Sequence, residues 1–129
     1  NRILLVPLRV KSWVFIVYVM LHFKFGDTIN RSDLMKKLIA MQFTRTKPDL
    51  ILIDGGAPQV NIARQVINEL NLKIPVVGIA KGPERKRNDF IYPRELHSQV
   101  LRNRSMLIQV RDEAHRFAVK HHRVLRSRI

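Results

Sequence analysis

Hydrophobic residues along this chain are gathered into short runs that predict buried strands. The first two runs extend from Ile3 to Leu8 and from Val10 to Leu21, with Arg9 and Lys11 among the residues that interrupt them. The uninterrupted apolar stretch that begins at Trp13 is much shorter than the roughly 20 residues that a bilayer-spanning helix needs. Both runs are therefore predicted to be strands of a globular core, and no membrane-spanning helix is expected.

A third run, at residues 48–56, reads Pro-Asp-Leu-Ile-Leu-Ile-Asp-Gly-Gly. Consecutive Leu and Ile residues between a proline and two glycines are typical of a strand that is buried on both faces. Asp54 then lies at the carboxyl end of the strand, the edge at which open α/β sheets hold ligands. Two interpretations stay open: Asp54 binds a ligand or metal ion, or it only forms a turn or caps the next helix.

A helix and another strand are predicted after this run. Residues 59–72 have helical periodicity, and residues 74–80 form a short apolar stretch with a proline near its start. Such a strand–helix–strand unit predicts two parallel strands joined by a right-handed crossover. A further helix is expected around residues 34–41, with Ser32 as its N-cap.

Residues 81–88 form a strongly basic segment that leaves the last of these strands on the same edge as Asp54. Such a segment is either a solvated surface or a contact for phosphate groups, and both interpretations stay open. After it, residues 89–92 and 98–101 are predicted to pair as a hairpin.

The chain ends in a predicted helix from about Ser105 to Ser127. One stripe along this helix is expected to be mostly core, and it consists of Leu107, Val110, Ala114, Phe117, His121 and Leu125. The stripe beside it consists of Ile108, Arg111, His115, Ala118 and His122. His115 is thus expected at the border between the buried and exposed faces. It is either a structural hydrogen-bonding residue or a catalytic one, and periodicity does not decide between them.

Composition adds a strong positive charge to this picture. The 129 residues contain 24 Lys and Arg against 10 Asp and Glu, which gives a net charge of +14. This excess favours a polyanionic partner, with nucleic acid first and an anionic membrane surface second. The length predicts a single domain, although a first residue of Asn1 is compatible with a fragment. The absence of cysteine excludes disulfides and thiolate zinc sites and permits a cytoplasmic location.

Three motifs carry a resemblance to a known family. They are the 48–56 segment followed by Gln59, the Val-Gly-Ile-Ala-Lys-Gly segment at 77–82, and the Gln-Val-Arg-Asp-Glu-Ala-His-Arg-Phe-Ala segment at 109–118. In this order they resemble the endonuclease domain of UvrC, the C subunit of the bacterial excinuclease, over roughly residues 48–129. The resemblance implies an RNase H-like fold, with a mixed central sheet flanked by helices. It also implies the 5′ incision of damaged double-stranded DNA in nucleotide excision repair, together with UvrB and the rest of the complex.

The resemblance also implies a site. The second aspartate and the histidine of the family's active site correspond to Asp54 and His115. Asp54 would bind Mg²⁺ or Mn²⁺, and His115 would support that metal through water or move a proton. Basic residues would hold the DNA backbone without reading bases, namely Lys81, Arg85, Lys86, Arg87, Arg111, Arg116 and Arg123.

One departure from the family changes the expected activity. The family's first-strand aspartate belongs to a Phe-Asp-Ile-Ser-His-like segment, whereas residues 1–25 contain no such pattern and no acidic residue precedes Asp27. The acidic residues that could replace it are Asp27, Asp33, Asp112 and Glu113, of which the last two are expected to be surface charges of the helix. The isolated chain is therefore predicted to have weak or no nuclease activity. The alternative is a catalytically silent module that keeps the fold and binds nucleic acid or protein.

Overall fold

The computed structural model describes the backbone of residues 2–21, 31–42, 48–81 and 88–127, and the side chains of residues 5–19, 31–40, 48–80 and 88–121. The elements follow the chain in this order: strands β1 (Arg2–Val10) and β2 (Trp13–Leu21), helix α1 (Arg31–Gln42), strand β3 (Leu50–Asp54), helix α2 (Ala57–Glu69), strands β4 (Val76–Lys81) and β5 (Asn88–Ile91), the short 3-10 helix η1 (Arg94–Leu96), and helices α3 (His97–Arg102) and α4 (Arg104–Ser127).

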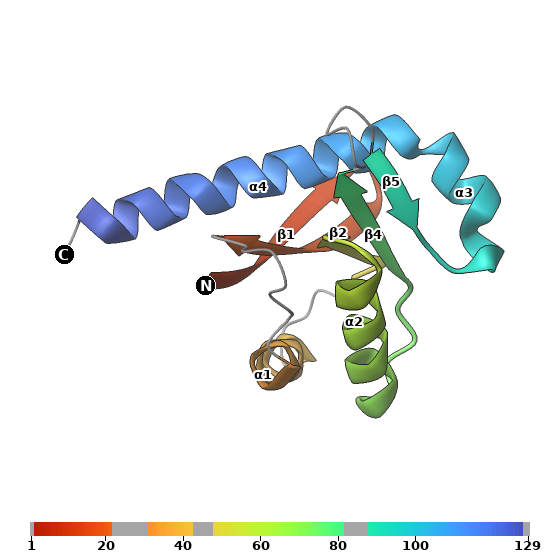
Figure 1. Ribbon diagram of the computed structural model, residues 1–129, viewed down its shortest axis with the longest axis horizontal. Coiled ribbons are helices and arrows are strands. Elements are labelled where there is room, and N and C mark those ends of the chain that lie inside the picture. The colour runs from red at the N-terminus through yellow and green to blue at the C-terminus, as the bar shows by residue number, and fades with distance from the viewer. Residues whose placement is uncertain (1, 22–30, 43–47, 82–87, 128–129) are drawn as a thin grey trace.

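The five strands form one mixed sheet in the order β1-β2-β3-β4-β5 (Figure 1). β1 and β2 are an antiparallel hairpin. β2, β3 and β4 run parallel to one another, and β5 returns antiparallel to β4. The predicted mixed sheet is confirmed, as is the parallel pairing of the two strands joined by α2.

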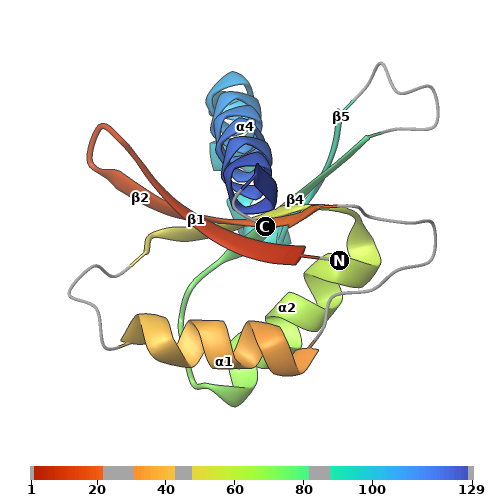
Figure 2. The ribbon, with the colours of Figure 1, turned by 90° about the vertical axis from the view of Figure 1, so that its left-hand side faces the viewer.

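Helices cover both faces of the sheet (Figure 2). α4 lies across one face, and its Leu107, Val110 and Ala114 are buried together with Val17 of β2 and Leu52 of β3. α1 and α2 cover the other face, where the alternate strand residues are buried with side chains of both helices. Strand residues therefore alternate between two apolar cores, as expected for a sheet buried on both sides.

The predicted hairpin between residues 89–92 and 98–101 is wrong. β5 pairs with β4 instead, through partners such as Phe90 and Ile79. Residues 98–101 belong to α3, which packs Val100 into the core beside α4. Pairing with β4 gives β5 the hydrogen bonds that a second hairpin strand would have supplied, so the chain after Pro93 is free to become helical.

Helix α4 is 24 residues long, and its second half extends past the sheet (Figure 1). The predicted core stripe is confirmed in the first half, where the helix lies on the strands. It is wrong at Phe117 and His121, because Phe117 is 57% exposed and His121 is exposed. Leu125 and His122 lie outside the described side chains. Within the described part of the chain, no helix is both long and apolar enough to span a bilayer.

Candidate functional site

The carboxyl end of β3 places Asp54 on the α4 face of the sheet. Along β3, Leu50 and Leu52 face α4, so by strand alternation Asp54 does too. On one side, Asp54 is in register with Ile79 of β4. On the other, β2 pairs with β3 up to Tyr18 and Ile53, and the next step in that register brings Val19 beside Asp54.

Two backbone N–H groups form the hydrogen bonds that shape the turn from β3 into α2. The Gly55 N–H donates to the Ile79 carbonyl at 3.1 Å, and the Gly56 N–H donates to Oε1 of Gln59 at 3.0 Å, which caps the start of α2. On β4, Gly78 lies directly under the helix, because a Cβ added there would be 2.3 Å from Cγ2 of Val60. The close approach of α2 to β4 therefore requires glycine at 78 and fixes the position of the turn beside Asp54.

His115 of α4 reaches Asp54 from above the sheet. Its Nδ1 lies 3.7 Å from Oδ2 of Asp54, and the side chains are 49% and 28% exposed, respectively. This distance allows electrostatic contact but exceeds that of a direct hydrogen bond. The structure thus brings together the two residues predicted for catalysis, which are 61 positions apart in the sequence (115 − 54).

Arg111, one turn before His115, joins α4 to β5. Its Nη1 donates to Oδ1 of Asn88 at 2.7 Å, and its Nε and Nη2 donate to Oδ1 of Asp112 at 3.0 and 2.9 Å. The side chain is only 9% exposed. Arg111 therefore positions the start of β5 against α4. Periodicity alone gave no sign of this link, because Asn88 is remote in sequence.

The other predicted DNA-binding residues are distributed unevenly over the described regions. Arg116 is on the outer side of α4 with its side chain 74% exposed, and it pairs with Glu113 at 3.1 Å. Lys81 closes β4, but its side chain lies outside the described residues, as does that of Arg123 on α4. Arg85, Lys86 and Arg87 also lie outside the described residues, so their contact with DNA stays a prediction.

The carboxylates that could share a metal ion with Asp54 are placed elsewhere, or lie outside the described residues in the case of Asp27. Asp33 is on α1, across the sheet from α4, and pairs with Lys37 at 3.1 Å. Asp112 and Glu113 are exposed on α4, as predicted, and pair with arginines. Among the side chains that the structure describes, no three His, Asp or Glu residues are grouped to hold a metal. Asp54 and His115 alone do not fit a nuclease metal centre, since Mg²⁺ prefers an octahedral shell of oxygen ligands.

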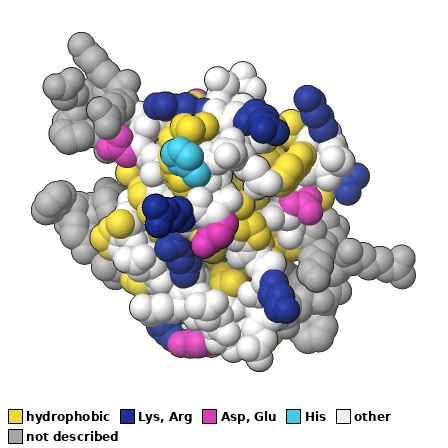
Figure 3. All heavy atoms as spheres, turned by 90° about the vertical axis from the view of Figure 1, so that its right-hand side faces the viewer, with side chains coloured by type: hydrophobic (Ala, Val, Ile, Leu, Met, Phe, Trp, Pro, Cys, Tyr) yellow, Lys and Arg dark blue, Asp and Glu magenta, His cyan; other side chains and the backbone are white. Residues whose placement is uncertain are grey.

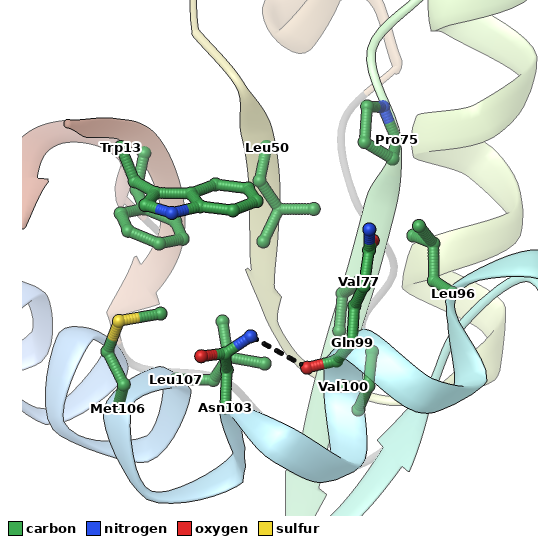
Figure 4. Close-up of a pocket in the computed structure, with 11 residues that line it drawn as sticks. Trp13, Leu50, Pro75, Val77, Leu96, Gln99, Val100, Asn103, Met106 and Leu107 are labelled. Atoms are coloured by element: carbon green, nitrogen blue, oxygen red, sulfur yellow. Dashed lines mark hydrogen bonds between the residues drawn. The ribbon is translucent and has the colours of Figure 1, made fainter.

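A small apolar pocket lies at the opposite end of the parallel strands (Figure 4). It has a volume of about 50 Å³ and is lined mostly by hydrophobic side chains, among them Trp13, Leu50, Val77 and Leu107. The Trp13 ring lies on one side of this space and Leu96 on the other. No charged residue lines this pocket, which lies at the opposite end of β3 from Asp54.

The sequence also matches known proteins. The sequence model of the UvrC RNAse H endonuclease domain matches residues 21–119. The chain is 50% identical over 84 residues to the UvrABC system protein C of Chlorobaculum tepidum, a match that covers 62% of this chain and 13% of that protein. It is 39% identical over 119 residues to the UvrABC system protein C of Streptococcus agalactiae, covering 82% of this chain and 20% of that protein. The matched region is thus at most about a fifth of the length of these relatives.

Proposed function

The chain belongs to the family of UvrC RNAse H endonuclease domains, and we propose that it is the part of a bacterial excision-repair nuclease that makes the 5′ incision in damaged double-stranded DNA. The proposal rests on one observation, namely that the side chain of His115 lies beside that of Asp54 at the carboxyl edge of the sheet. The net charge of +14 supports it, because cationic surfaces attract the phosphate backbone.

In this proposal the two residues have different roles. The carboxylate of Asp54 is a hard oxygen donor of the kind that Mg²⁺ or Mn²⁺ prefers, and further oxygen ligands would have to join it before such an ion could stabilise charge at a scissile phosphate. His115 is half exposed beside it and can give or take a proton at Nδ1 or Nε2. Arg116 on the outer side of α4 would contact the DNA backbone, while Arg111 holds β5 in place.

We further propose that this chain by itself cuts DNA weakly or not at all. The strand beside β3 is β2, and its side chains at the level of Leu52 and Asp54 are Val17 and Val19, both fully buried. Neither valine can bind a cation. This observation favours the second candidate function, a catalytically silent module that binds DNA or the partner proteins of the repair complex, UvrB among them. Either function would be exercised in the bacterial cytoplasm, where the DNA lies.

A nicking experiment separates the two candidates. A lesion-bearing duplex is incubated with the chain and Mg²⁺ or Mn²⁺, and incised strands are measured for the wild type, Asp54→Asn and His115→Gln. Glu113→Gln is the matched control, because it removes an exposed carboxylate on α4 that does not face Asp54.

If the chain is the nuclease, nicking is present in the wild type and Glu113→Gln and is lost in the other two variants. If it is a silent module, the duplex binds in a salt-sensitive manner and no variant nicks it. Nicking that survives Asp54→Asn would contradict the assignment of the site.

A further inference from the structure

A hollow of about 450 Å³ lies between β5 and the helices α3 and α4. Its lining mixes aromatic, amide, cationic and anionic groups, and consists of Asn88, Asp89, Phe90, Tyr92, Val100, Leu101 and Arg104. Figure 3 shows the side of the molecule on which β5 and α3 lie, with Lys and Arg side chains spread among hydrophobic ones. This volume is within the range of small-ligand sites in proteins.

The hollow is close to Asp54 on the same face of the sheet. Asp54 is in register with Ile79, and Ile79 is in register with Phe90. Phe90 packs against the α4-side core that contains Ile79. Neighbouring strands are about 4.8 Å apart, so β5 runs about 10 Å from β3 at this level. Arg111 connects the two places, because it lies one turn from His115 on α4 and donates a hydrogen bond to Asn88, which lines the hollow.

The groups in the hollow have the chemistry that binds a nucleobase. The guanidinium carbon of Arg104 lies 5.4 Å from the centre of the Phe90 ring, and its Nη2 donates to the Asn88 carbonyl at 3.4 Å. These contacts hold an exposed, planar cation in one place. Tyr92 presents a second ring, whose hydroxyl is 2.7 Å from Nδ1 of His97. Proteins bind unstacked bases against aromatic rings and guanidinium planes of this kind.

We propose that this hollow binds one unstacked base of the DNA strand whose backbone reaches Asp54 and His115, with Arg104 as the principal stacking group. The inference rests on the proposed DNA-binding function and adds to it a contact with a base beside the contacts with phosphates. Arg104 serves here to position the strand and is not a catalytic residue. Because stacking is tolerant of base identity, the hollow fixes the position of the strand without reading its sequence.

The test compares two single strands with the same number of phosphates, one carrying bases and the other made of abasic sites. Binding of the full chain to each is measured by fluorescence anisotropy at low salt. The variants are Arg104→Gln, Arg104→Lys and the matched control Arg102→Gln, which removes the same charge from an exposed arginine that does not line the hollow. Fluorescence of Trp13, the single tryptophan, reports whether each variant is folded.

The wild type is expected to prefer the base-carrying strand by about tenfold, in line with the stacking of one base. Arg104→Gln removes most of this preference, and Arg104→Lys removes part of it because the ammonium group has no plane. Arg102→Gln weakens binding to both strands equally and leaves the preference unchanged.

Two results would overturn the inference. If Arg104→Gln and Arg102→Gln weaken binding to both strands by the same factor, Arg104 is a phosphate contact only, and the proposed DNA-binding function stands without the base site. If no variant, the wild type included, binds either single strand, the base site fails, and binding and nicking of the lesion-bearing duplex then decide whether the proposed function stands.

Discussion

The two strands that flank β3 differ in what they contribute. β4 lies within the residues that match the UvrC RNAse H endonuclease domain, and it provides Gly78 under α2 and the carbonyl that fixes Gly55. β2 lies almost entirely before the matched residues. It contains no charged residue, yet it pairs with β3 as regularly as β4 does.

The residues that a strand needs to join the sheet differ from those that it needs to contribute to the site. A strand completes the sheet when its apolar residues alternate correctly between the two cores, and β2 satisfies this demand with Phe15 and Val17 on the α4 side and Ile16 and Tyr18 on the other. A metal site needs, in addition, further oxygen ligands close to Asp54. The β2 residue beside Asp54 in the continued register is Val19, which provides none.

The largest effect is expected when a carboxylate is placed on β2 beside Asp54. Val19→Asp should destabilise the fold by about 3–5 kcal/mol, because it buries an unpaired charge at a fully buried position next to a second carboxylate. Mn²⁺ or Mg²⁺ should recover part of this loss by binding both carboxylates of the folded state. Thermal unfolding with and without the metal measures both effects.

Val17→Asp is the matched control for this prediction, because Val17 is equally buried on the same strand but is level with Leu52. It should lose as much stability and gain nothing from the metal. Equal recovery of both variants by Mn²⁺ would show that the register position beside Asp54 has no special value.

On the β4 side, the expected effect of a single methyl group is smaller but still large. Gly78→Ala should cost about 1–3 kcal/mol of unfolding free energy, because its Cβ would overlap Cγ2 of Val60 and lie 3.0 Å from the Gly55 carbonyl oxygen. Urea unfolding measures the loss. In the Val60→Ala background the same substitution should cost less, since the overlapping methyl group is gone. Additive losses in the double variant would contradict this account.

The elements were more predictable from sequence than the site. Short apolar runs and helical periodicity placed β3, α2, β4 and α4 close to their observed bounds, because burial on one face or two faces determines those patterns. The pairing of β2 beside β3 was not predictable, since any apolar strand could occupy that position. Nor was the bond between Arg111 and Asn88, because a hydrogen bond between distant residues leaves no periodic signal. The hairpin at 98–101 was wrong because the hydrogen bonds of β5 are made with β4.

Tyr18 is a further difference between the flanking strands. Its side chain is buried on β2, and its hydroxyl makes no hydrogen bond within the part of the chain that the structure describes. Tyr18→Phe should therefore be neutral or stabilise the fold by up to about 1 kcal/mol at pH 7. Thermal unfolding of the two proteins at one pH measures the difference.

The same substitution should matter more in alkali. Burial, with a smaller contribution from Asp33, raises the pKa of Tyr18 above its ordinary value of 10.0. The unfolded state therefore loses its proton first, and the wild type loses stability as the pH rises above 10. Tyr18→Phe lacks this loss, so its advantage should grow above pH 10. An advantage that stays constant between pH 7 and 11 would mean that Tyr18 is solvated in the folded protein.

The smallest effect concerns the turns that lead into the two flanking strands. Both turns contain a residue with positive φ, Lys11 at 57° before β2 and Asn71 at 54° before β4. Asparagine tolerates this conformation better than lysine, because its short side chain can bond to the local backbone. Lys11→Asn should therefore stabilise the fold by about 0.5 kcal/mol, and Asn71→Lys should destabilise it by a similar amount. Ser12→Asn, next to Lys11 but without positive φ, should change little in thermal unfolding. If Ser12→Asn stabilises as much as Lys11→Asn, the gain arises from asparagine in the hairpin loop in general, and the two turns do not differ in strain.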